Sequence, residues 1–337
     1  MNDGGEGAGG ATAEAGTNAA PAPARQSMRS SAPPWVKRSG RKVSRTFGRL
    51  TSGGRMMPSF LVAGGQRCGT TALHRALSAH PVVAAPVLHK GVNYFDLHYE
   101  RGPGWYRGHF PLLSTARRRA GHWSAGTHEP QAMESSGYYL YHPLALPRIA
   151  ADLPMVRLLV ILRDPVERAY SAYKHGVARG FETEGSFERA LELEPQRLAG
   201  EEERLRDDPS YVSHSHRHHA YVTRGRYVEQ LLPVFEQFGR ERVHVVQSED
   251  FLTRPESVYS GILAFLGLPE WLPPSFDRHN ARPGWPMPES VRDRLDDHFR
   301  PYDERLAELL GHPLAWRSAQ VGGEAATDRS STSSASS

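Results

Sequence analysis

Apolar runs and amphipathic stretches alternate along the middle of the chain. Three apolar runs have the length of strands: Phe60–Ala63, Val156–Leu162 and Val243–Gln247. The second run is continuous, as expected for a strand that is buried on both faces. Helical periodicity or helix-start signals mark Thr70–Ala79, 165–178, Arg226–Phe238, Glu256–Leu266, 289–299 and 303–310. The alternation predicts an α/β fold: a single domain with a central parallel sheet flanked by helices.

Composition divides the 337 residues into a folded body and two polar ends. Residues 1–57 are mostly Gly, Ala, Ser, Pro and Arg, and we expect a disordered basic arm there. The body spans 58–317, and 318–337 form a second disordered tail. Within the arm, 35–50 shows roughly helical spacing of apolar residues, so a weak surface-binding helix and a solvated tether are both open.

Positive charge is concentrated near the amino end of the chain. Residues 16–95 hold twelve Lys or Arg and no Asp or Glu, whereas the rest carries 29 basic and 37 acidic residues. Such a field attracts phosphate, sulfate, nucleic acid or a membrane surface. A single Cys excludes internal disulfides and Cys-rich zinc sites. With no apolar stretch of spanning length and no secretory signal pattern, we expect a cytoplasmic protein.

The strongest local feature is an apolar run that leads into a glycine-rich turn and then a helix. Residues 60–73 read FLVAGGQRCGTTAL, and we call residues 64–69 the glycine loop. Glycines let successive N–H groups point at one anion, and the helix start adds partial positive charge. Gly64 and Gly69 have the spacing of the two glycines of a Walker A motif. The position of the motif's lysine is occupied by Thr70, which argues against nucleoside triphosphate hydrolysis. The alternative is a turn that binds no ligand.

A second motif follows the run 156–162, and we call residues 163–173 the arginine motif. It contains Arg163, Asp164, Pro165, Arg168, Ser171 and Tyr173. Arg163 is expected at the carboxyl end of a strand, where open α/β sheets place ligands. With Ser171 two turns along the next helix, it can grip a second phosphate. The alternative is a structural ion pair between Arg163 and Asp164.

The two motifs, in this order, resemble those of the sulfotransferases that use 3′-phosphoadenosine-5′-phosphosulfate (PAPS). Residues 66–73 are similar to the family's 5′-phosphosulfate loop, [PR]-[KR]-[SG]-G-T-T-x-L. Residues 163–173 match its 3′-phosphate motif, R-[DN]-P-x-x-R-[AL]-x-S-x-Y. The segments 90–96 (KGVNYFD), 134–139 (ESSGYY) and 225–268 are similar to further segments of glycan sulfotransferases. The resemblance implies the P-loop-like sulfotransferase fold over 58–317.

The resemblance also implies a reaction and a set of site residues. The reaction is in-line transfer of a sulfuryl group from PAPS to a hydroxyl of a carbohydrate, glycolipid or related metabolite, with no metal required. Arg67 takes the position of the family's catalytic Lys, as an electrostatic stabiliser. The expected donor-binding residues are Gly65, Gln66, Arg67, Cys68, Gly69, Thr70 and Thr71 at the 5′ end, Arg163 and Ser171 at the 3′-phosphate, and Arg282, with Arg278, in a loop over the nucleotide.

The general base is the least determined part of the expected site. The glycan enzymes carry Glu directly after the Lys of their K-E-x-x-F-F segment, where this chain has Gly91. Glu134, aligned with an acidic residue of the family, is the first substitute and is predicted as a catalytic residue. Further candidates are Asp96, His89 and Glu129. The alternative for Glu134 is a structural partner for Lys90 or an arginine.

Two more features carry expectations. Cys68 lies inside the glycine loop, where we interpret it as a small filler. The alternative is a reactive thiol, because a helix start can depress the pKa of a thiol, and its alkylation would then block PAPS binding. Residues 213–219 (SHSHRHH) hold four histidines, which we interpret as an acceptor entrance or a polar loop rather than a metal site.

Two other functions remain open on the sequence. One is a non-catalytic sulfotransferase-like nucleotide-binding protein, which the missing Glu at Gly91 motivates; the other is a P-loop kinase. Nucleic-acid binding is not expected, because the basic arm lacks interleaved aromatic residues. The arm motivates the hypothesis of peripheral contact with the inner face of a membrane that carries the acceptor.

Overall fold

Five strands form one parallel sheet in the order β2-β3-β1-β4-β5. The computed structural model describes residues 48, 50–87, 89–124, 128–276 and 286–318. The strands are β1 (Pro58–Val62), β2 (Val83–Ala84), β3 (Gln131–Ser135), β4 (Arg157–Leu162) and β5 (Val243–Gln247). The predicted fold class is confirmed.

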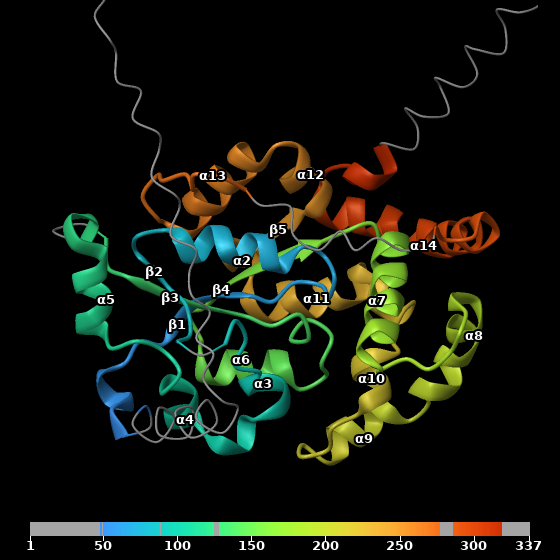
Figure 1. The fold of residues 1–337 in the computed structure, drawn as a ribbon, viewed down its shortest axis with the longest axis horizontal. Helices are drawn as coiled ribbons and strands as arrows, with labels where there is room; N and C mark the ends of the chain where they lie inside the picture. The colour runs from blue at the N-terminus through green and yellow to red at the C-terminus, as the bar shows by residue number, and fades with distance from the viewer. Residues whose placement is uncertain (1–47, 49, 88, 125–127, 277–285, 319–337) are drawn as a thin grey trace, which may run out of the picture. The chain divides into compact units, whose positions relative to one another are not determined.

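Helices connect and cover the strands (Figure 1). The α-helices are α2 (Thr70–Ala79), α3 (Tyr94–Leu97), α4 (Pro103–Arg107), α5 (Leu113–Ala120), α6 (Ala145–Asp152), α7 (Pro165–Arg179), α8 (Phe187–Leu198), α9 (Glu201–Asp207), α10 (His214–His218), α11 (Tyr227–Phe238), α12 (Ser248–Thr253), α13 (Pro255–Leu266) and α14 (Glu289–Leu310). The 3₁₀ turns are η1 (Ser52–Gly54), η2 (Tyr99–Arg101), η3 (Gly121–Ser124), η4 (Thr223–Gly225) and η5 (Arg240–Arg242). In Figure 1, α2, α12 and α13 lie on one side of the sheet, and α3, α6 and α11 lie on the other.

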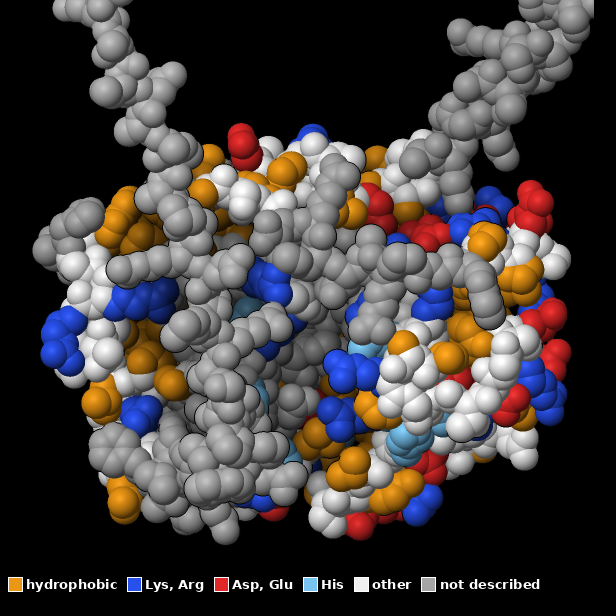
Figure 2. All heavy atoms as spheres, viewed as in Figure 1, with side chains coloured by type: hydrophobic (Ala, Val, Ile, Leu, Met, Phe, Trp, Pro, Cys, Tyr) orange, Lys and Arg blue, Asp and Glu red, His pale blue; other side chains and the backbone are white. Residues whose placement is uncertain are grey.

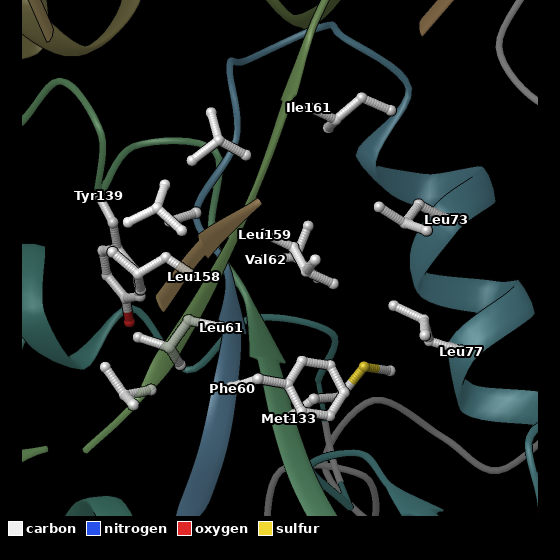
Figure 3. Packing of buried hydrophobic residues seen from close by; sticks show 14 of the residues in the cluster. Phe60, Leu61, Val62, Leu73, Leu77, Met133, Tyr139, Leu158, Leu159 and Ile161 are labelled. Carbon is white, nitrogen blue, oxygen red and sulfur yellow. The ribbon is translucent and has the colours of Figure 1, made fainter. Parts of the chain in front are cut away.

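The strand β1 buries side chains on both faces of the sheet. Phe60 and Val62 point toward Leu73 and Leu77 of α2, whereas Leu61 points to the opposite side (Figure 3). All five side chains are fully buried. Because successive side chains of a strand alternate between faces, a strand covered on both sides is apolar throughout. This explains the continuous apolar run of β4, which pairs with β1.

Most predicted elements agree with the structure. The strand predicted at Phe60–Ala63 is observed as β1 at Pro58–Val62, two residues earlier at its start and one at its end. Strand β5 and helix α2 have the predicted bounds, and the ends of β4, α7, α11 and α13 differ from the prediction by one residue. Both stretches predicted as helical, 289–299 and 303–310, are helical, but their division into two helices is wrong, because α14 is one helix of 22 residues. Pro301 lies inside it, although proline disfavours a helix interior.

The tails that we predict to be disordered, and the arm that we expect to contact a membrane, fall largely on residues that the structure does not describe, as does Arg282. Among the described residues, no helix is both long and apolar enough to cross a bilayer.

We expect Gly64→Ala to destabilise the fold. Its Cβ would lie 2.6 Å from Ile161 N and 2.9 Å from Ile161 O, and neither backbone atom can move without disturbing β4. Overpacking of this kind costs about 1–3 kcal/mol, which chemical denaturation would measure. Gly261→Ala is the matched control, because nothing lies within 4 Å of its Cβ and Ala is favoured in a helix by up to about 1 kcal/mol. Equal stability of the two variants would contradict the prediction.

Candidate functional site

The glycine loop connects the carboxyl end of β1 to the amino end of α2. Gly65 N donates to Ile161 O at 3.1 Å, which ties the loop to the neighbouring strand β4. Arg67 has φ of 71° and Gly69 has φ of 89°, so the chain curls through two left-handed residues before α2 begins. Gly69 caps α2 without a side-chain hydrogen bond. The first N–H groups of the helix, with their partial positive charge, are therefore not capped by a side chain.

The arginine motif follows β4, the neighbour of β1. Asp164 caps α7 by accepting from Val166 N at 2.8 Å and Glu167 N at 3.4 Å. Arg163 pairs with Glu167 Oε2 at 3.4 Å. Asp164 thus caps the helix, and Arg163 pairs with Glu167 rather than with Asp164, the alternative that the sequence left open. The guanidinium of Arg163 remains about a third exposed at the end of the strand.

Direct contacts bring the two motifs together. Arg67 Nε donates to Ser171 Oγ at 3.1 Å, so the glycine loop touches α7. Tyr227, the first residue of α11, donates its hydroxyl to Arg163 O at 2.8 Å and lies 3.6 Å from Cys68 Sγ. Sequence analysis assigned Tyr227 no role, although it stands in the quoted segment 225–268. The structure therefore joins the predicted 5′ and 3′ sites at a single place.

Several buried cations surround this place without carboxylate partners in the described part of the chain. Arg168 is fully buried and donates to Tyr221 O, while its Nε and Nη1 have no hydrogen-bond partner among the described residues. Arg224 lies between the rings of Tyr138 and Tyr141, and its Nη1 donates to Gln66 Oε1 at 2.9 Å. Burial lowers the pKa of Arg224 to about 10.

The surface view agrees with this distribution of charge. Figure 2 shows Lys and Arg side chains gathered around the middle of the visible face, between α2 and α7. Buried positive charge without negative partners is costly, so an anion bound here would be stabilised.

Glu134 lies at the end of β3 and is completely buried. Its Oε1 accepts from Val92 N at 2.6 Å, Asn93 N at 3.0 Å and Tyr139 Oη at 2.8 Å, and its Oε2 accepts from Tyr106 Oη at 2.6 Å. Burial raises the pKa of this carboxyl to about 7. A base has to reach the acceptor hydroxyl, and this carboxylate is enclosed by protein donors. These four donors favour a positioning role for Glu134, while its role as the base stays a prediction.

The other base candidates occupy different environments. Asp96, in α3, accepts from Asn93 Nδ2 at 3.0 Å and Ser136 Oγ at 3.4 Å, and its Oδ1 has no hydrogen-bond partner among the described residues. Glu129 is exposed and paired with Arg117 at 3.0 Å. It precedes β3 and so lies at the opposite end of the parallel sheet from the glycine loop. His89 is half-buried next to Lys90.

The position of the family's usual base leaves no room for a side chain. A Cβ on Gly91 would lie 2.6 Å from Ser135 O. Residues 90–93, which we call the strap, are held against the end of β3 by Ser135 N donating to Lys90 O at 3.4 Å and by the two bonds to Glu134. Glycine at this position is therefore a packing requirement of the strap.

Lys90 is a site residue that sequence reasoning missed. Its Nζ donates to Thr70 Oγ1 at 3.0 Å and Thr71 Oγ1 at 3.3 Å, at the start of α2. The available signal was its place in the segment KGVNYFD, but spacing alone does not reveal which loop a lysine reaches.

Burial determines the chemistry of Cys68. The thiol is fully buried, and burial raises its pKa to about 11. The burial agrees with the interpretation of Cys68 as a small filler, and the pKa is raised rather than depressed. The effect of its alkylation on PAPS binding stays a prediction. The desolvation of a thiolate in this packed interior outweighs the stabilising effect of nearby positive charge.

The histidine-rich segment packs into the fold. His216 is buried and stacks on Tyr141, with Tyr138 Oη 2.8 Å from its Nδ1. His214 and His219 each place Nε2 near Phe181 O, at 3.1 and 2.9 Å. In the described ranges, no group of three or more His, Cys, Asp or Glu side chains is arranged to hold a metal.

Comparison with known proteins gives consistent matches. The chain is 24% identical over 326 residues to the membrane-associated sulfotransferase kil1 of Dictyostelium discoideum, covering 77% of this chain and 67% of that protein. It is 25% identical to the mouse (Mus musculus) heparan sulfate glucosamine 3-O-sulfotransferase 6, covering 78% and 75%. The Caenorhabditis elegans bifunctional heparan sulfate N-deacetylase/N-sulfotransferase 1 is 26% identical, but this chain spans only 30% of its length.

A crystal structure of a sulfotransferase from Alicyclobacillus acidocaldarius has 30% identity and a TM-score of 0.56, covering 78% of this chain and 99% of that one. The model of the sulfotransferase domain family matches residues 57–279, which include the glycine loop, the strap and the arginine motif. This chain therefore belongs to the sulfotransferase family.

Proposed function

We propose that this protein transfers a sulfuryl group from PAPS to a hydroxyl of a carbohydrate, glycolipid or related metabolite. The observation that carries the proposal is the bond from Arg67 Nε to Ser171 Oγ, because it joins two anion-binding loops at one place. A single nucleotide with phosphate groups at both ends suits that arrangement. The names of the heparan sulfate sulfotransferases among the relatives support a carbohydrate acceptor.

The residues present suit a bisphosphorylated donor. A Cβ on Gly64 would lie 2.6 Å from Ile161 N, and a Cβ on Gly65 would lie 2.6 Å from Cys68 Sγ. The absence of side chains at these positions therefore lets the loop backbone pack closely against its neighbours. Residues 65–71 would hold the phosphosulfate end through backbone N–H groups. Arg163 and Ser171 would hold the 3′-phosphate, since a guanidinium makes charge-assisted bonds to phosphate. Arg282, outside the described residues, stays a prediction.

The donor supplies the activated sulfuryl group, and the protein's part is positioning and charge stabilisation. Arg67 donates from Nε to Ser171 Oγ and cannot give up its proton near neutral pH, so it acts as a fixed positive charge. The acceptor hydroxyl needs a base within hydrogen-bond reach.

We assign the role of base to Asp96. Asp96 is nearly as buried as Glu134. The difference is that its Oδ1, unlike either oxygen of Glu134, has no hydrogen bond among the described residues, while Asn93 and Ser136 hold Oδ2. Burial raises the pKa of Asp96 to about 6, closer to the operating pH than an ordinary Asp. Ser136 lies just beyond β3, at the same edge of the parallel sheet as the glycine loop.

Glu134 contacts the strap and so acts on the position of Asp96 indirectly. Its carboxylate orders the strap by accepting from Val92 N and Asn93 N, and Asn93 in turn donates to Asp96. This chain of contacts makes Glu134 a positioning residue for the proposed base.

A glutamate side chain does not fit at position 91, so the family's usual base is absent. This favours one alternative function, a non-catalytic PAPS-binding protein. Incubation with sulfur-labelled PAPS and a panel of heparan-type oligosaccharides and glycolipids separates the two. Labelled product that disappears in Arg67→Ala supports catalysis. Donor binding without any labelled product supports the alternative.

A peripheral membrane contact remains part of the proposal for the basic arm, most of which lies outside the described residues. One relative is named a membrane-associated sulfotransferase, which is consistent with an acceptor presented at a membrane.

The first prediction concerns the 3′-phosphate. Thermal unfolding should shift upward with adenosine 3′,5′-bisphosphate (PAP) more than with adenosine 5′-phosphate, because Arg163 binds only the former's extra group. Arg163→Gln should weaken PAP binding roughly 10- to 100-fold, the usual worth of hydrogen bonds to charged groups. Arg179→Gln, at the exposed carboxyl end of α7, is the control. Similar shifts with both nucleotides would count against the assignment.

The second prediction concerns Asp96. A base must be deprotonated, so kcat should fall as the pH drops below about 6, the value to which burial raises its pKa. Asp96→Asn should reduce kcat roughly 10²- to 10⁴-fold and remove this acidic limb. Asp297→Asn, on the exposed face of α14, should leave the profile unchanged. An Asp96→Asn enzyme with the wild-type acidic limb would exclude Asp96 as the base.

The third prediction concerns stability and pH. Because burial raises the pKa of Glu134 from 4.5 to about 7, the folded state favours its protonated form. This contribution to stability is complete below about pH 4.5 and is lost as the pH rises through 7. The free energy of unfolding should therefore depend less on pH between 4.5 and 7 in Glu134→Gln than in the wild type. The exposed Glu129→Gln should keep the wild-type slope, and an unchanged slope in Glu134→Gln would refute this account.

A further inference from the structure

Lys90 lies at the amino end of α2 without a negative partner. Its Nζ donates to the hydroxyls of Thr70 and Thr71, at 3.0 and 3.3 Å. No carboxylate pairs with it anywhere in the described ranges. A largely buried ammonium beside the positive end of a helix is unfavourable unless an anion binds there. The arrangement therefore points to a ligand group with negative charge above the first turn of α2.

Contacts with the end of β3 fix the backbone of the strap, which carries Lys90. Lys90 O accepts from Ser135 N at 3.4 Å. Further along, Val92 N and Asn93 N donate to the buried Glu134, while Gly91 permits a close approach to Ser135 O. These contacts fix the backbone on which Lys90 is carried, so its side chain is directed at α2 by the fold rather than by chance.

The loop's own cation faces the other motif. Arg67 Nε is bonded to Ser171 Oγ on α7, whereas Lys90 is bonded to the first two residues of α2. Lys90 therefore adds a second positive charge beside the start of α2, where the family resemblance places the phosphosulfate.

We propose that Lys90 is a second catalytic cation of the sulfuryl-transfer centre, held by Thr70 and Thr71 so that its ammonium contacts the phosphosulfate end of the donor. The inference rests on the proposed function. During transfer, the bond between sulfur and the bridging oxygen breaks, and its electron pair stays on that oxygen. A new bond joins sulfur to the acceptor oxygen, whose proton passes to Asp96. Lys90 keeps its own proton and stabilises the charge that grows on the phosphate.

The electrostatic surroundings support this role. Burial, followed by the nearby charge of Arg75, lowers the pKa of Lys90 to about 8. On α2, the neighbouring His74 is itself kept neutral, because burial lowers its pKa to about 4. At the end of β3, Glu134 lies beneath the strap, and Arg67 lies on the glycine loop. In the protein without donor, Lys90 therefore loses its proton just above neutral pH, and a bound anion would restore it.

The test compares Lys90→Met and Lys90→Arg with the wild type. Lys90→Met should lower kcat/KM for PAPS roughly 10²- to 10³-fold, whereas Lys90→Arg, which keeps the charge, should recover part of the loss. The wild-type kcat/KM should fall as the pH rises above about 8, the value to which burial lowers the pKa of Lys90. Lys90→Arg should show no such fall, because Arg keeps its proton.

A second measurement needs no turnover. The rate at which acetic anhydride acetylates Lys90, followed by peptide mass spectrometry, should report an apparent pKa of about 8 in the unliganded protein. PAP should protect the residue. Arg75→Gln is the matched control: it removes the neighbouring charge, so the apparent pKa should rise while kcat at pH 7 stays within about twofold.

The outcomes separate the two proposals. If the wild type binds neither PAPS nor PAP, the proposed function fails. If it binds and turns over PAPS, but Lys90→Met retains kcat/KM within about threefold and PAP gives no protection, only the role of Lys90 fails. A loss of folding in Lys90→Met does not remove the test, because the acetylation profile and Lys90→Arg still decide it.

Discussion

The backbone of the glycine loop lies so close to β4 that a methyl group on residue 64 would sit 2.6 Å from Ile161 N. This approach sets where the loop turns, and Gly65 N then bonds to the same residue of β4. Because the arginine motif begins directly after β4, the two motifs are held together by the contact between their strands. The bond from Arg67 to Ser171 follows from this arrangement.

The glycine-loop site collects positive charge that the described protein does not neutralise. Arg168 and Arg224 are buried near the loop, and Lys90 lies at the start of α2. A protein meant to stay empty at this place would have carboxylates beside these cations. Their absence among the described residues shifts the electrostatic balance toward a bound anion, at the expense of the stability of the unliganded fold.

The sequence predicted the elements that carry the motifs, because strong periodicity and start signals mark them. Helix α2 and strand β5 have the predicted bounds, and Asp164 and Pro165 mark the start of α7. Strand β3 escaped prediction because Gln131, Glu134 and Ser135 disrupt its apolar pattern, although Glu134 is buried by Tyr106 and Tyr139. The role of Lys90 escaped for a different reason: it depends on a long-range contact that no local pattern encodes.

The same limit applied to the predicted base. Alignment placed Glu134 near the centre, but only the structure shows that its two oxygens are surrounded by N–H and hydroxyl donors. Asp96 lies three residues beyond Asn93. It differs from Glu134 because one of its carboxylate oxygens, Oδ1, has no hydrogen bond in the described part of the chain. Whether a carboxylate supports a site or reacts in it is decided by such details of tertiary packing.

The single cysteine has a practical consequence for spectroscopy. Cys68 is sealed within the loop region, and burial raises the pKa of its thiol to about 11, so it is a poor nucleophile toward maleimide reagents. A cysteine introduced on an exposed helix face would therefore accept a fluorophore or spin label selectively. Movements of the strap and of α7 can be followed in this way without altering the native residue at the centre.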